Sequence, residues 1–108
     1  MNKEKNILQE LDEVLQNRKL NGSKLSYAAK LLKEGPTSIS KKIREESEEL
    51  IAASLSEDKE EENIIHEAAD LWFHTLVLLA HENISSNQIL EELESRFGIS
   101  GLIEKKNR

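Results

Sequence analysis

The sequence predicts an all-α protein: a compact helical bundle of four main helices, in a single domain covering residues 1–108 and completed by dimerisation. Helix-forming residues dominate the composition, and Pro36 is the only proline among 108 residues. A chain of this length is one domain. Only 4% of the residues are aromatic, so aliphatic side chains must fill the core. A small helical protomer with one very apolar helix often completes its core by oligomerising.

The first predicted helix covers roughly residues 4–19. Apolar side chains recur there at helical spacing, at Ile7, Leu8, Leu11, Val14 and Leu15. Residues 21–23 include a glycine and should stop this helix. A short turn of helix is expected at 26–33, ended by Gly35.

The second main helix is predicted at roughly 37–55, because Pro36 suits the first turn of a helix. Asp58 and Glu61 have the spacing of a capping box, which predicts that the third main helix opens there and runs to about residue 81.

Another capping box is formed by Ser85 and Gln88 and should open the fourth main helix. That helix is expected to end at Phe97, with Gly98 as its C-cap. A short tail with a basic end follows at 101–108.

Composition excludes several classes of function. The net charge is −6 and no basic tract is present, which disfavours a nucleic-acid partner. The chain has no cysteine, so it has neither disulfides nor thiolate chemistry, which is compatible with the cytoplasm. The first six residues are too polar for a signal peptide, and the longest apolar run, residues 76–80, is too short to span a bilayer. We therefore expect a cytoplasmic protein with no membrane partner.

Acidic residues gather on one face of the predicted 37–55 helix. Glu45, Glu46 and Glu49 fall within an arc of about 100°, together with Lys42, while Glu48 falls outside it. Taken alone, this charge run is most simply a solvated acidic face.

A second acidic pair changes that interpretation. Residues 68–80 are apolar on nearly every side of a helix, which predicts that this helix is buried. Asp70 lies within this stretch, and Glu67 lies at its edge. A buried carboxylate is costly unless it is paired or binds metal. Several carboxylates on two packed helices would repel one another, and a divalent cation resolves that conflict. All-oxygen ligands favour Mg²⁺ or Mn²⁺, and the histidines lack zinc-ligand spacing.

Three histidines accompany these acids. His74 should project near Glu67 and Asp70, and we expect it to be a core histidine bonded to a carboxylate rather than a catalytic group. His66 and His81 are expected at the surface or at a helix end.

The two acidic motifs together, Glu45-Glu46-x-x-Glu49 and Glu67-x-x-Asp70, resemble the signature of the all-α NTP pyrophosphatase (MazG-like) superfamily. Within it, the chain is most similar to the phosphoribosyl-ATP pyrophosphatase family of histidine biosynthesis. This narrower resemblance rests on four features: Gly22-Ser23 leading to Ser26-Tyr27-Ala28-Ala29-Lys30-Leu31, then Lys42-x-x-Glu45-Glu46-x-x-Glu49, the segment 67–74 and the tail 101–108. Residues 21–25 replace a more usual proline-rich segment, and Trp72-Phe73 replaces a commoner Leu-Tyr.

The resemblance implies an enzyme that hydrolyses 1-(5-phosphoribosyl)-ATP to 1-(5-phosphoribosyl)-AMP and pyrophosphate, by attack of water at the α–β phosphoanhydride with Mg²⁺, or alternatively Mn²⁺. The implied metal ligands are Glu46, Glu49, Glu67 and Asp70. Glu45 would be a further ligand or would orient the attacking water. The implied substrate-binding residues are Tyr27, Lys30, Lys42, Arg44, Lys105 and Arg108.

Several alternatives stay open at this point. Lys42 and Arg44 could instead pair with Glu46 and Glu48 along the helix, and Tyr27 could stack on a base or only cap the core. The family resemblance also implies a homodimer or a dimer of dimers, with sites near subunit interfaces. The competing functions are a house-cleaning nucleoside triphosphate pyrophosphatase of the same fold and a non-enzymatic helical interaction module with an acidic face.

Overall fold

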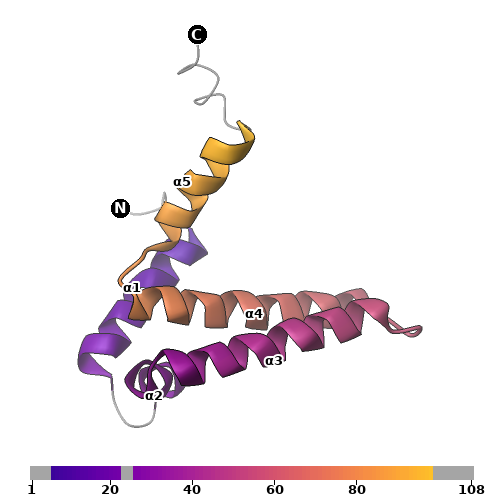
Figure 1. Ribbon diagram of the computed structural model, residues 1–108, viewed down its shortest axis with the longest axis horizontal. Helices are drawn as coiled ribbons and strands as arrows, with labels where there is room; N and C mark the ends of the chain where they lie inside the picture. Colours follow the sequence, from indigo (N-terminus) through magenta and orange to yellow (C-terminus); the bar gives the residue numbers. More distant parts are fainter. Residues whose placement is uncertain (1–5, 23–25, 99–108) are drawn as a thin grey trace.

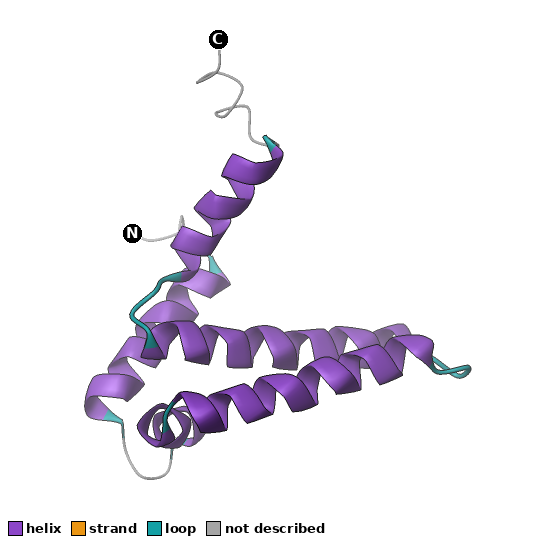
Figure 2. Cartoon of the chain, in the orientation of Figure 1, coloured by secondary structure: helices purple, strands orange, loops and turns teal. Residues whose placement is uncertain are grey.

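The computed structural model describes residues 6–22 and 26–98, and throughout these ranges the regular structure is helical (Figure 2). In chain order the helices are α1 (Ile7–Asn21), α2 (Tyr27–Glu34), α3 (Pro36–Leu55), α4 (Glu61–His81) and α5 (Ser86–Phe97). The all-α prediction is confirmed. The short turn expected at 26–33 is a complete two-turn helix, α2, and the tail at 101–108 lies outside the described residues.

Most helix ends follow from local sequence. Pro36 occupies the first turn of α3, and Gly35 before it has φ of 98°, a left-handed conformation that favours glycine. The Ser85–Gln88 capping box and the left-handed Gly98 after α5 are both confirmed. Asn6 forms a capping box with Gln9 that the sequence analysis did not identify, so α1 begins later than predicted.

The predicted capping box at Asp58 and Glu61 is wrong. The N-cap of α4 is Glu60, and its side chain makes no capping hydrogen bond. Asp58 lies two residues earlier, in a turn where its backbone N–H donates to Ser56 Oγ at 3.2 Å. The turn between α3 and α4 therefore ends later than the sequence spacing suggested.

The helices form two groups. α3 and α4 pack side by side along most of their length as an antiparallel hairpin, and α2 lies at the open end of that hairpin (Figure 1). α1 contacts both α2 and α4, and α5 packs against α1 and projects away from the hairpin beyond the C-terminal end of α4 (Figure 1). This arrangement leaves one side of the hairpin uncovered.

The core lies where the first four helices meet. Its buried apolar residues are Leu15, Leu31, Leu32, Ile39, Leu76, Val77 and Ala80. α4 is not buried on every side, contrary to the prediction, because its neighbours cover only part of its circumference. Trp72 is 62% exposed, and Ile65 is also exposed.

Two sets of hydrogen bonds connect α1 to the segment where α4 ends and α5 begins. Asp12 Oδ2 accepts hydrogen bonds from Ser86 N at 3.0 Å and from Ser86 Oγ at 2.7 Å. Lys19 Nζ donates to the carbonyl oxygens of Ala80 and His81, both at 3.0 Å, at the last turn of α4. These bonds satisfy helix-terminal groups that would otherwise be unpaired, so they fix the angle at which α5 leaves the hairpin. Within 6–22 and 26–98 no helix has the length and apolar character needed to cross a membrane.

Candidate metal centre

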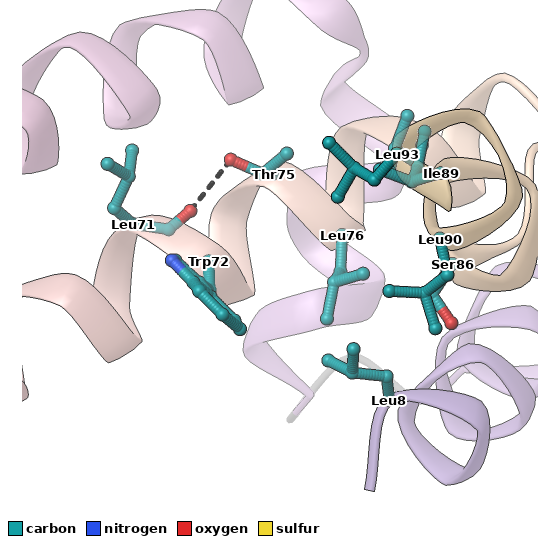
Figure 3. Close-up of a pocket in the computed structure, with 10 residues that line it drawn as sticks. Leu8, Leu71, Trp72, Thr75, Leu76, Ser86, Ile89, Leu90 and Leu93 are labelled. Carbon is teal, nitrogen blue, oxygen red and sulfur yellow. Dashed lines mark hydrogen bonds between the residues drawn. The ribbon is translucent and has the colours of Figure 1, made fainter. Parts of the chain in front are cut away.

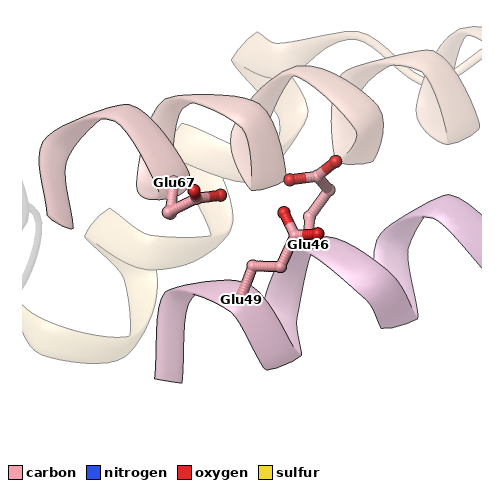
Figure 4. A group of neighbouring side chains, drawn as sticks. All are labelled: Glu46, Glu49 and Glu67. Atoms are coloured by element: carbon pink, nitrogen blue, oxygen red, sulfur yellow. The ribbon is translucent and has the colours of Figure 1, made fainter. Parts of the chain in front are cut away.

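Three carboxylates meet between the two helices of the hairpin. Glu46 and Glu49 lie one turn apart on α3, and their side chains point toward Glu67 on α4 (Figure 4). One oxygen from each of the three lies within 4.8 Å of the others. The i, i+3 spacing on α3 and the antiparallel packing of α3 against α4 together bring the acids to one place.

Two oxygens of this cluster are buried without a partner. Glu46 is only 8% exposed, and within the described part of the chain neither Glu46 Oε1 nor Glu67 Oε1 has a hydrogen-bond partner. A buried carboxylate oxygen without a donor is strongly unfavourable. A divalent cation would satisfy both atoms, and a set of oxygen ligands fits Mg²⁺ or Mn²⁺. The residues present therefore fit a metal ion.

The electrostatics of the cluster agree with its geometry. Burial raises the pKa of the Glu46 carboxyl, and the charges of Asp70 and Glu49 raise it further. Burial also raises the pKa of Glu67, and the neighbouring Glu49 carboxylate raises it further. Both carboxyls thus hold protons more tightly than usual when no cation is bound.

Asp70 and Glu45, the other predicted acids, pair with basic side chains on their own helices. Asp70 Oδ2 lies 3.4 Å from His66 Nε2, one turn back on α4, and its side chain is 39% exposed. The expected burial of Asp70 is therefore wrong, because this side of α4 is open to solvent. Glu45 Oε1 lies 3.2 Å from Lys42 Nζ and its side chain is also partly exposed.

The structure describes some of the predicted phosphate-binding basic residues and shows their surroundings. Lys42 pairs with Glu45 rather than with Glu46, and the hydrogen bond to Glu45 is the main reason that the pKa of Lys42 is raised. Arg44 is exposed and makes no ion pair with Glu48 within the described ranges. Lys30 is exposed on α2. The predicted phosphate ligands Lys105 and Arg108 lie outside the described residues.

His74 is a core histidine, as expected, but its partner is not a carboxylate. It is 5% exposed, and its Nδ1 lies 2.9 Å from the backbone carbonyl oxygen of Asp70. Its Nε2 lies 2.7 Å from the hydroxyl of Tyr27 on α2. The i−4 carbonyl is the nearest acceptor for a ring on a buried helix face, and it takes the place that we predicted for a carboxylate. His66 is exposed and His81 is the last residue of α4, as predicted.

An apolar groove, which the sequence analysis did not identify, lies between α1, α4 and α5 (Figure 3). Its volume is about 340 Å³, and it is lined by Leu8, Leu71, Trp72, Thr75, Leu76, Leu79, Ser86, Ile89, Leu90 and Leu93. Helical spacing puts its α4 residues roughly opposite Glu67 and Asp70 on that helix. The i, i+3 and i, i+4 spacing of the apolar residues in α5 was the available signal.

Comparisons with known proteins find relatives over most of the chain. Residues 8–97 match the family model described as phosphoribosyl-ATP pyrophosphohydrolase. The chain is 50% identical over 102 residues to the phosphoribosyl-ATP pyrophosphatase of Ruthia magnifica, covering 94% of this chain and 95% of that one. It is 44% identical over 104 residues to the protein of the same name from Hydrogenovibrio crunogenus, covering 94% of this chain and 92% of that one.

Proposed function

The chain belongs to the phosphoribosyl-ATP pyrophosphohydrolase family, and from this premise we propose that it hydrolyses 1-(5-phosphoribosyl)-ATP to 1-(5-phosphoribosyl)-AMP and pyrophosphate in histidine biosynthesis. One structural observation carries the proposal for the site. The two unpartnered buried oxygens of Glu46 and Glu67 lie in a cluster of three carboxylates between α3 and α4. That arrangement suits a divalent cation, and such cations are used mainly on phosphates.

In this proposal Glu46, Glu49 and Glu67 hold Mg²⁺, with Mn²⁺ as an alternative. When bound, the cation neutralises charge on the phosphoanhydride. Asp70 lies one turn from Glu67 and completes the ligand set if its side chain turns away from His66. Glu45 stays either a further ligand or the group that orients the attacking water.

Hydrolysis also requires residues that bind the phosphates and position the attacking water. Lys42 lies on the same face of α3 as the acids, and its ammonium group, now paired with Glu45, is well placed to exchange that partner for a phosphate. Lys30 on α2 and Arg44 on α3 are exposed cations. We propose Lys105 and Arg108 as further phosphate ligands, contributed by the basic tail of the single domain.

We propose that the active form is a homodimer or a dimer of dimers. The groove between α1, α4 and α5 and the exposed Trp72 beside it form an apolar surface that one chain leaves open. A second copy suits this surface, because two-fold symmetry places identical apolar residues on both sides of the interface. We expect α3 and α4 to contribute to that interface. A cytoplasmic location is also proposed, since the substrate is a highly charged nucleotide that does not cross a bilayer unaided.

Substrate choice tests the proposed function. Purified protein with Mg²⁺ should release pyrophosphate from phosphoribosyl-ATP far faster than from ATP or dUTP. Equal or faster turnover of a plain triphosphate would favour the house-cleaning alternative. If no nucleotide releases pyrophosphate with either Mg²⁺ or Mn²⁺, the enzymatic proposal is wrong. The remaining alternative is then the non-enzymatic helical interaction module.

A further inference from the structure

One hydrogen bond of His74 has a direction that its partner fixes. The carbonyl oxygen of Asp70 can only accept, so His74 Nδ1, at 2.9 Å from it, must carry the proton. In a neutral imidazole the other nitrogen is then an acceptor. A neutral ring suits this buried position, where neither nitrogen contacts a carboxylate of the described residues, and the Tyr27 hydroxyl, at 2.7 Å from Nε2, then donates its proton to His74.

The rings around His74 keep it in this orientation. Tyr27 meets the imidazole edge-on, with ring centroids 5.8 Å apart and planes at 88°, and Phe73 meets it at 5.3 Å and 79°. His74 is almost wholly buried, whereas Tyr27 is 49% exposed. The pair thus joins a rigid position in α4 to a side chain of α2 that reaches solvent.

Two hydrogen bonds connect Tyr27 through His74 to Asp70, which lies one turn from Glu67 on α4. The charges of Lys42, Glu46, Glu45 and Asp70 all act on its hydroxyl. Burial is the largest influence and raises the pKa of Tyr27, so the hydroxyl keeps its proton and remains a donor to His74. Because that proton is already used, the lone pairs on the Tyr27 oxygen are what the hydroxyl can offer to the site.

We propose that His74 is a positioning residue for the hydrolysis: by accepting the Tyr27 proton, it holds the Tyr27 oxygen as a hydrogen-bond acceptor for an O–H donor. That donor is a sugar hydroxyl of the substrate or the water that attacks it. Phosphate oxygens, which accept only, are not bound by Tyr27 in this arrangement. This inference rests on the proposed function and deepens it.

Kinetics of four single variants, and of the double variant Tyr27→Phe/His74→Met, test the inference. Tyr27→Phe keeps the ring and removes the hydroxyl. His74→Met removes the acceptor, and His74→Gln restores an amide acceptor at a similar reach. Thr75→Val is the matched control, since it removes another hydrogen bond to a backbone carbonyl four residues earlier in α4, from Thr75 Oγ1 to Leu71 at 2.8 Å, on the groove side of the helix (Figure 3).

We expect Tyr27→Phe and His74→Met each to lower kcat/KM about tenfold, the effect of one hydrogen bond. The double variant should be no worse than either single variant, because both remove the same bond. The kcat/KM of His74→Gln should stay within about threefold of the wild-type value, and the kcat/KM of Thr75→Val should equal the wild-type value. A rise in KM alone assigns the donor to a substrate hydroxyl, whereas a fall in kcat alone assigns it to the water.

Two results would overturn the inference. One is a Tyr27→Phe variant with kcat and KM both within twofold of wild type. The other is an additive loss in the double variant, which would mean that His74 acts only through packing. If His74→Met does not fold, Tyr27→Phe and His74→Gln decide the matter. Failure of wild-type protein on phosphoribosyl-ATP is a separate result that concerns the proposed function, and the variants are then compared on whichever nucleotide the wild type hydrolyses.

Discussion

Removing one charge from the carboxylate cluster should stabilise the metal-free protein. In Glu46→Gln the shape of a buried side chain is kept and its charge is lost. The neighbouring carboxylate oxygens lie within 4.8 Å, and each unit charge at that distance repels Glu46 by about 1 kcal/mol even at the permittivity of water. Since about 1 kcal/mol moves the Tm of a domain of this size by roughly 4–8 °C, we expect the metal-free Tm to rise by about 5 °C.

The same substitution should remove the response to metal. A ligand at about 100 times its Kd stabilises the folded state by about 2.7 kcal/mol, so saturating Mg²⁺ should raise the wild-type Tm clearly. In Glu46→Gln that rise should be largely lost, measured by calorimetry at one fixed protein concentration. Glu48→Gln, exposed on the same helix, is the control and should leave both Tm values within the small range typical of surface changes. A lower metal-free Tm, or an undiminished Mg²⁺ response in Glu46→Gln, would refute this account of the cluster.

The charge of Glu46 also sets a pH dependence. The pKa of Glu46 and the pKa of Glu67 are raised above the ordinary value of 4.5, so the folded protein binds these protons more tightly than the unfolded chain. Their contribution to stability is complete below that ordinary value and is lost as the pH rises through the folded-state pKa. The metal-free wild type should therefore lose this contribution on going from mildly acidic to neutral pH, and Glu46→Gln should lose less of it. An identical pH profile for the two proteins would contradict the assignment.

Two further predictions concern the ligands and the interface. Glu49→Gln and Asp70→Asn should each lower kcat/KM about 10²-fold or more, which corresponds to roughly 3 kcal/mol. Glu48→Gln should behave like wild type. An equal loss of kcat/KM in Glu48→Gln would mean that the assumed helical phase of α3 is wrong. Trp72→Glu should turn the oligomer into a monomer, measured by light scattering, because it places a charge on an exposed apolar surface. Leu20→Glu, on an exposed residue at the end of α1, should leave the oligomer intact, and a wild-type monomer at micromolar concentration would refute the interface.

Much of the fold was predictable because it depends on local chemistry. Pro36 at the start of α3, the Ser85–Gln88 capping box and the left-handed Gly98 each act within one helical turn. The same is true of Glu46 and Glu49, whose spacing alone puts them on one face of α3. Their approach to Glu67 was predictable only because two amphipathic helices joined by a short turn must pack antiparallel.

What the sequence could not predict depends on tertiary context. Asp70 has the right helical phase to join the cluster, yet its side chain turns to His66, because both lie on an open side of α4. An apolar stretch cannot distinguish burial within one chain from burial against a second copy, so the exposure of Trp72 was missed. The pairing of His74 with Tyr27 depends on how α2 crosses the hairpin, which no local pattern encodes.

Anomalous diffraction from crystals soaked in Mn²⁺ is the most direct test of the central claim, that this cluster holds the cation used in hydrolysis. We expect one strong peak between α3 and α4, within bonding distance of side-chain oxygens of Glu46, Glu49 and Glu67, and absent from crystals of Glu46→Gln. A protein that hydrolyses phosphoribosyl-ATP with Mn²⁺ but shows its anomalous peak elsewhere, or shows none at these three carboxylates, would contradict the account.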